Sequence, residues 1–151
     1  MAQRNRIVPW IPVMLWIGVI VGLGSNPFQH EETSRLLRPL LRWLFPDWSH
    51  GQIAAAHALV RRSAHVVEYA IAAVLTYNAL IRTLPTPSGV RLALGTLAVV
   101  ALVAAGDELR QMVLPDRTGS LVDVGLDLLG GVTGLALAPL VVRRPPEARD
   151  G

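Results

Sequence analysis

Four long apolar runs dominate the pattern of hydrophobic and polar positions along this chain. They cover about residues 8–24, 63–84, 91–113 and 121–142, and each is near the ~20 residues that an α-helix needs to cross a bilayer. A small soluble helical bundle is the alternative, because buried helices can be apolar on every side. Four such helices in 151 residues would leave too little polar surface to cover them. The pattern therefore predicts an all-α polytopic membrane protein with four transmembrane helices.

The first run resembles a signal peptide, because it follows Arg4 and Arg6. Its apolar core is longer than the ~7 to 15 residues of a signal peptide's central region, and no A-x-A-like cleavage site follows it. We therefore interpret this run as a retained first helix.

The segment 31–45, between the first two runs, has the pattern of an amphipathic helix. Its leucines recur at helical spacing and its arginines fall on another side, which is typical of a helix that lies in the membrane interface. Trp43 and Trp48 suit the same depth. Docking of a partner or a lipid is the alternative role of this segment. Pro39 marks either a kink or the first turn.

Turn and charge signals complete the organisation of a single domain, 1–151. The sequence PTPSG at 85–89 predicts a tight turn, Ser120 can cap the fourth helix, and the tail 143–151 is predicted to be disordered. The positive-inside rule is a tie on the raw arginine count. It favours a cytoplasmic amino terminus when the arginines of the amphipathic segment and of the polar cluster described below are discounted. We adopt that topology, with both termini cytoplasmic.

Composition and charge support the membrane assignment. Hydrophobic residues make up 52% of the chain, and its mean hydropathy is +0.43. All 14 basic residues are arginines, and they lie around the ends of the apolar runs. That distribution suits anchoring beside anionic lipid head groups rather than binding of nucleic acid. The absence of cysteine excludes disulfides, thiolate catalysis and cysteine metal sites.

Polar side chains concentrate at one face of the predicted bundle. With four antiparallel spans, the start of the second, the end of the third and the start of the fourth meet at that face. An acid at the bilayer centre costs ~2.5 to 3.5 kcal/mol on translocon scales, so acids inside the spans should face the bundle interior and find partners there. The predicted pocket residues are Arg62, His65, Glu68, Tyr69, Asp107, Glu108, Arg110, Gln111, Arg117, Asp123 and Asp127.

Glycines continue the line of acids along the fourth helix. Asp123, Asp127, Gly130 and Gly134 share one stripe at helical spacing. Glycine is common in membrane helices, but small residues at this spacing also let two helices approach closely. We predict that Gly130 and Gly134 pack against a neighbouring helix and bring the polar side chains together.

The chemistry of this cluster leaves three interpretations open: an internally paired structural network, a cation site whose arginines contact phosphate, and a proton-linked pocket. No cofactor is predicted, although Asp107, Glu108 and Asp123 could hold a divalent cation with lipid phosphate completing its shell. Neither H-E-x-x-H nor G-x-S-x-G occurs, so no recognised catalytic motif is present. Three other histidines fall in or near the long connection and are expected to be solvated: His30, His50 and His57.

Three spaced motifs connect the polar residues of the last three predicted spans. They are Arg62-x-x-His65-x-x-x-Tyr69, Asp107-Glu108-x-x-Gln111-x-x-x-Pro115-x-Arg117 and Asp123-x-x-x-Asp127-x-x-Gly130. With these motifs the chain resembles the VanZ-like family of small bacterial membrane proteins from about residue 60 to 137. The family commonly has lysine in place of Arg62 and asparagine in place of Asp127. An aspartate there can donate a hydrogen bond only when protonated, and otherwise must recruit an arginine or a cation.

The resemblance implies a protein of the bacterial inner membrane, related to one associated with low-level resistance to the glycopeptide teicoplanin. It implies no particular reaction. The leading hypothesis is a cell-envelope protein whose partners are membrane lipids, with a pocket for a phospholipid or a polyprenyl-phosphate precursor. In this hypothesis three arginines contact the anion (Arg62, Arg110 and Arg117), four acids orient them or hold a cation (Glu68, Asp107, Glu108 and Asp123), and His65, Tyr69 and Gln111 form hydrogen bonds. The alternatives are a membrane enzyme that uses His65 with an acid, and a small proton-linked transporter.

Overall fold

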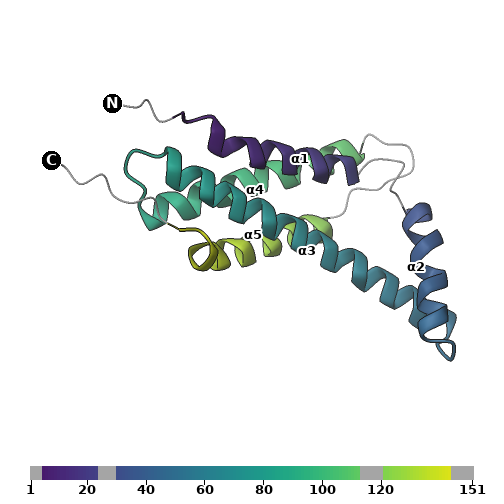
Figure 1. Cartoon of the computed structure of the whole chain (residues 1–151). Helices are drawn as coiled ribbons and strands as arrows, with labels where there is room; N and C mark the ends of the chain where they lie inside the picture. Colours follow the sequence, from purple (N-terminus) through teal and green to yellow (C-terminus); the bar gives the residue numbers. More distant parts are fainter. Residues whose placement is uncertain (1–4, 24–29, 113–120, 144–151) are drawn as a thin grey trace.

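The computed structural model describes residues 5–23, 30–112 and 121–143, and within these ranges the chain is helical with no strand (Figure 1). In chain order the elements are η1 (Val8–Trp10), α1 (Ile11–Leu23), α2 (His30–Leu44), α3 (His50–Thr83), α4 (Gly89–Met112) and α5 (Leu121–Val141). The predicted all-α class is confirmed. The predicted cap at Ser120 and nearly all of the predicted tail lie outside the described ranges.

Helix α3 is the centre of the bundle. It makes its most extensive contacts with α5, and it also packs against α4 and α1. These four helices run side by side, whereas α2 packs against the first part of α3 beyond the end of the bundle (Figure 1). One core cluster joins Ile20 of α1, Tyr69 of α3 and Val100 of α4, and a second joins α3, α4 and α5 nearer the other end.

Three helices are long and apolar enough to cross a membrane: His50–Thr83, Gly89–Arg110 and Val122–Val141. The first predicted span is also an apolar helix, Val8–Gly22, but it is shorter. At 1.5 Å per residue its length is ~22 Å, less than the ~30 Å of a bilayer's hydrocarbon core. The helical membrane architecture is confirmed, and the number of membrane crossings stays a prediction.

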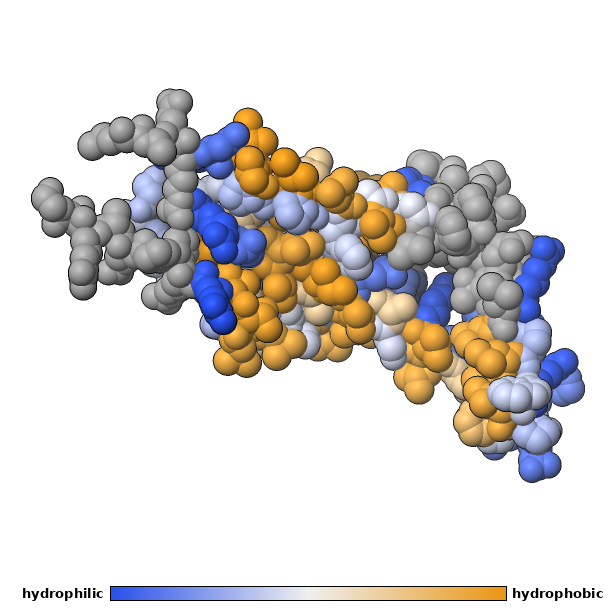
Figure 2. Space-filling view, in the orientation of Figure 1, coloured by the Kyte–Doolittle hydropathy of each residue, from blue (hydrophilic) through white to orange (hydrophobic). Residues whose placement is uncertain are grey.

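The outer face of the bundle is apolar, as lipid requires. Figure 2 shows hydrophobic side chains gathered along the bundle, with hydrophilic ones toward its ends. Leu102 and Leu140 are among the most exposed of them, while small residues such as Ala73 and Ala138 are fully buried. Close-packed membrane helices show this pattern, with large apolar side chains on the outside and small side chains between the helices.

The connection between α1 and α3 contains more helix than the apolar pattern predicts. The amphipathic helix α2 forms at His30–Leu44, close to the predicted 31–45. Helix α3 begins at His50 rather than near residue 63, because Ser49 and Gln52 form a reciprocal capping box at its start. The aromatic rings of Phe45 and Trp48 stack at 4.0 Å in the turn between the two helices. At 34 residues α3 is ~51 Å long, so it extends beyond one bilayer core.

The prediction that His57 is solvated is wrong. Its exposed fraction is 6%, and it lies on the early part of α3 within electrostatic reach of Arg38 of α2. A local sequence pattern could not show this burial, because it arises where α2 folds back against α3.

Candidate functional site

The site depends on an unusually close approach between α3 and α5. A Cβ atom placed on Gly130 would overlap the carbonyl oxygen of Val66, and one on Gly134 would overlap the carbonyl oxygen of Ala70. Both contacts are with backbone, which cannot move aside as a flexible side chain can. Glycine at these two positions therefore sets the separation of the two helices.

The intervening glycine of α5 faces the other neighbour. A Cβ on Gly131 would lie 2.6 Å from Cγ1 of Val100 on α4. Consecutive glycines thus let α5 fit closely against both α3 and α4. The polar residues that precede these glycines on α5 are brought against the polar residues of α3 by the same packing.

The most buried acid of the cluster pairs with a histidine. The Nδ1 atom of His65 on α3 lies 3.0 Å from Oδ1 of Asp127 on α5, and Asp127 is only 3% exposed. An ionised carboxylate can only accept, so His65 donates when Asp127 carries its charge. The aspartate at this position, which departs from the residue expected by resemblance to the family, thus has a histidine as its partner.

A second pair lies one helical turn earlier on both helices. The Nη2 atom of Arg61 is 3.9 Å from Oδ2 of Asp123. His65 follows Arg61 by four residues and Asp127 follows Asp123 by four, so the two pairs repeat at the same offset along two parallel helices. Arg62 is the arginine of α3 predicted to line the pocket, but its side chain is exposed and its neighbour Arg61 faces Asp123. The matched four-residue spacing is the signal that could have identified Arg61.

Helix α4 contributes a third pair, formed by two of its own residues. Nη2 of Arg110 lies 2.9 Å from Oδ1 of Asp107, three residues earlier on α4. Asp107 is 7% exposed, while the Arg110 side chain is 29% exposed. The buried acid therefore orients an arginine that reaches toward the surface.

Glu68 and Tyr69 occupy different environments although they are adjacent. The Glu68 side chain is half-buried, and its backbone carbonyl accepts a hydrogen bond of 2.9 Å from Nε1 of Trp16, which ties α1 to α3. Tyr69 is 1% exposed within the apolar cluster that includes Ile20 and Val100. Its hydroxyl makes no hydrogen bond of standard geometry among the described residues, although the Asp127 carboxylate lies near enough to interact with it.

The remaining predicted site residues are described only in part. Glu108 is half-buried on α4. Gln111 lies in the last turn of that helix but its side chain is outside the described set, as is the whole of Arg117. In the described parts of the chain no group of three or more acidic or histidine side chains is arranged to hold a metal ion.

Among the described residues, three polar pairs cluster at one end of the bundle: two arginine–aspartate ion pairs and the hydrogen-bonded pair of His65 and Asp127, contributed by α3, α4 and α5. Its two most buried acids, Asp107 and Asp127, each have a nitrogen partner at hydrogen-bonding distance. Buried charges without partners would cost several kcal/mol each, on the order of the desolvation penalty of a single ion. Such an arrangement can hold arginines in fixed positions beside the membrane surface and can place a proton between His65 and Asp127.

Comparison with known proteins identifies a family match that covers the residues of this cluster. A family model described as VanZ/LLP1 matches residues 10–142, which include every residue of the three pairs. No curated protein and no solved structure matches the chain. The VanZ-like resemblance is thus confirmed over nearly the whole chain. This protein belongs to the VanZ/LLP1 family and is a VanZ-like membrane protein.

Proposed function

We propose that this protein binds a phosphate-bearing membrane lipid or lipid-linked cell-wall precursor at the end of the bundle where the three polar pairs lie. The proposal rests on one observation: within the two arginine–aspartate pairs the acid is more buried than the arginine. Asp107 is buried while the side chain of its partner Arg110 is 29% exposed, and in the looser second pair the side chain of Arg61, at 34%, is more exposed than that of Asp123, at 20%. Acids inside and arginines outside is an arrangement that presents guanidinium groups to an anion.

Arginine has more hydrogen-bond donors than pairing with a single carboxylate uses, so a paired arginine can still bind an anion. A guanidinium has five N–H donors in a rigid plane, so one carboxylate does not exhaust it, and its geometry matches phosphate. Arg62, Arg110 and Arg117 are the predicted anion contacts, to which the geometry adds Arg61. Under the predicted topology this end faces outward, where a cell-wall precursor on a polyprenyl phosphate would be reached.

The family resemblance extends the proposal to the cell envelope. We place the protein in the bacterial inner membrane, and we propose a contribution to teicoplanin resistance through the same lipid site. This part rests on the family analogy, because a fold does not determine a function.

Native mass spectrometry of the detergent-purified chain with polyprenyl phosphate tests the binding proposal. The variants are Arg110→Gln, which removes an arginine, and Asp107→Asn, which removes the acid that orients it. Retention should fall roughly tenfold in Arg110→Gln, the loss expected for one charged hydrogen bond. Arg91→Gln is the matched control, since Arg91 is exposed at the other end of α4. Equal retention in all variants would overturn the proposal.

A membrane enzyme is the second candidate, favoured by the His65 and Asp127 pair. A histidine whose Nδ1 is held by a carboxylate can act as a general acid or base through Nε2. Phosphate release from a bound polyprenyl pyrophosphate, absent in His65→Gln while lipid retention persists, would establish this function. Intact lipid after prolonged incubation with the wild-type protein would exclude that reaction for this substrate.

A further inference from the structure

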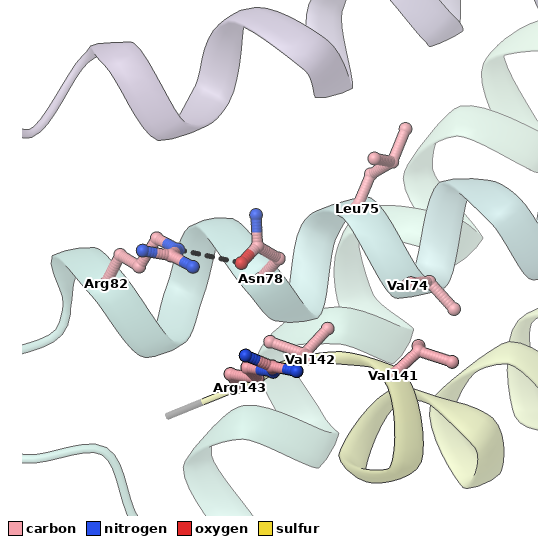
Figure 3. Close-up of a pocket in the computed structure, with 7 residues that line it drawn as sticks. All are labelled: Val74, Leu75, Asn78, Arg82, Val141, Val142 and Arg143. Atoms are coloured by element: carbon pink, nitrogen blue, oxygen red, sulfur yellow. Dashed lines mark hydrogen bonds between the residues drawn. The ribbon is translucent and has the colours of Figure 1, made fainter. Parts of the chain in front are cut away.

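A second site with polar residues lies between the ends of α3 and α5, at the opposite end of the bundle from the three polar pairs. The structure has a pocket of about 410 Å³ there, within the range of small-molecule sites. Its wall is apolar on both helices, formed by Val74 and Leu75 of α3 and by Val141 and Val142 at the end of α5 (Figure 3).

The rim of this pocket is cationic. Asn78, Arg82 and Arg143 line it, and the Nε atom of Arg82 donates a 2.7 Å hydrogen bond to Oδ1 of Asn78 (Figure 3). That bond fixes the plane of the guanidinium while leaving its terminal nitrogens available. Within the described ranges no side chain pairs with Arg143, and the pocket lining contains no carboxylate.

The ordinary role of such arginines is to anchor helix ends at the membrane interface. Cations are favoured at helix C-termini, and long basic side chains reach for the head-group region. Anchoring alone explains neither the pocket between the two arginines and the apolar wall nor the presence of two arginines and no carboxylate in its lining. The combination is electrostatically complementary to an anion.

The lining of the pocket changes from apolar to cationic along its length. On α3 it extends from Val74 to Arg82, eight residues or ~12 Å along the axis, from an apolar part to a cationic rim. A ligand that matches it has an anionic group attached to a hydrocarbon chain. A free phosphate would use only the rim and would leave the apolar wall uncovered.

We propose that this pocket binds an anionic phospholipid, with its phosphate between Arg82 and Arg143 and the start of an acyl chain against Val74 and Val141. The site is separate from the one proposed above, on other residues at the other end of the bundle. Under the predicted topology it faces the cytoplasmic leaflet, whose anionic lipids attract basic groups.

The test is native mass spectrometry of the full chain with phosphatidylglycerol, with phosphatidylcholine and inorganic phosphate as the other two probes. Wild type should retain phosphatidylglycerol and not the other two. The double variant Arg82→Gln/Arg143→Gln should lose roughly tenfold or more of that retention. Arg91→Gln, a cation near the same end but outside the pocket, should retain it fully.

A second variant tests the cavity without changing charge. Val141→Trp fills the apolar wall and should lower phosphatidylglycerol retention while the thermal unfolding of the protein shows that it is folded. Polyprenyl-phosphate retention at the other end should be unchanged in all of these variants, so the failure of one site is distinguishable from the failure of the other. Equal phosphatidylglycerol retention in wild type and both pocket variants, or equal retention of inorganic phosphate and phosphatidylglycerol by wild type, would overturn the proposal.

Discussion

The Nδ1 atom of His65 lies 3.0 Å from Oδ1 of Asp127, across the interface of α3 and α5. Asp127 is buried in α5, which is long and apolar enough to cross a membrane, and an acid without a partner would be costly there. The pair exists because Gly130 and Gly134, on the same stripe of α5, let the two helices approach. Helix packing and polar chemistry are therefore coupled at this interface.

Removing either member of this pair should destabilise the protein. We expect Asp127→Ala to lower the free energy of unfolding by about 1–3 kcal/mol, because it leaves the half-buried imidazole of His65 without its partner. A double-mutant cycle with His65→Ala should give a coupling energy of about 0.5–3 kcal/mol, measured by denaturation in detergent micelles. Asp127→Asn should cost less, since its amide oxygen still accepts. A coupling of zero would contradict the pair.

Substitution of Gly134 should separate α3 from α5. Gly134→Ala places a methyl group on the carbonyl oxygen of Ala70, and the strain should cost about 1–3 kcal/mol. Gly125→Ala is the matched control on the same helix, because nothing lies within 4 Å of the added Cβ. The control should be neutral or more stable by up to about 1 kcal/mol, as alanine restricts the helix backbone more than glycine does. Similar melting temperatures for the two variants would argue against close packing at Gly134.

Arg61 and Arg62 should differ although they are adjacent. Arg61→Gln removes the partner of Asp123 and an arginine of the proposed anion site, so retention of polyprenyl phosphate should fall roughly tenfold. Arg62 is also a predicted anion contact, but among the described residues no acid pairs with it and fixes its position, so Arg62→Gln should have a smaller effect. Native mass spectrometry of both proteins decides the matter. A larger loss in Arg62→Gln would reverse the assignment.

Tyr69→Phe should leave the stability unchanged or raise it. The Tyr69 hydroxyl is buried without a hydrogen-bond partner among the described residues, and an unsatisfied buried hydroxyl costs about 1–3 kcal/mol. Tyr77→Phe serves as a control in the second core cluster. If thermal unfolding shows that Tyr69→Phe destabilises the protein by more than 1 kcal/mol, as about one hydrogen bond contributes, the hydroxyl has a partner.

The apolar runs and one amphipathic pattern were sufficient to locate the helices, apart from the first part of α3. Runs of about 20 apolar residues and the amphipathic spacing at 31–45 are local properties, and the observed elements follow them closely except at the start of α3. There the apolar criterion missed the capping box of Ser49 and Gln52, which starts the helix in a polar segment. The signal was present in the sequence, but a search for membrane spans does not detect it.

The linear pattern was enough to identify the segments apolar enough to cross a membrane and to group most of the polar side chains at one end of the bundle. It could not reveal that Arg61 rather than Arg62 faces Asp123, that His65 faces Asp127, or that His57 is buried, because these depend on how the helices pack. Pairing between residues about sixty positions apart depends on the rotation and separation of whole helices. Those are set by backbone contacts at Gly130 and Gly134, which no local pattern specifies.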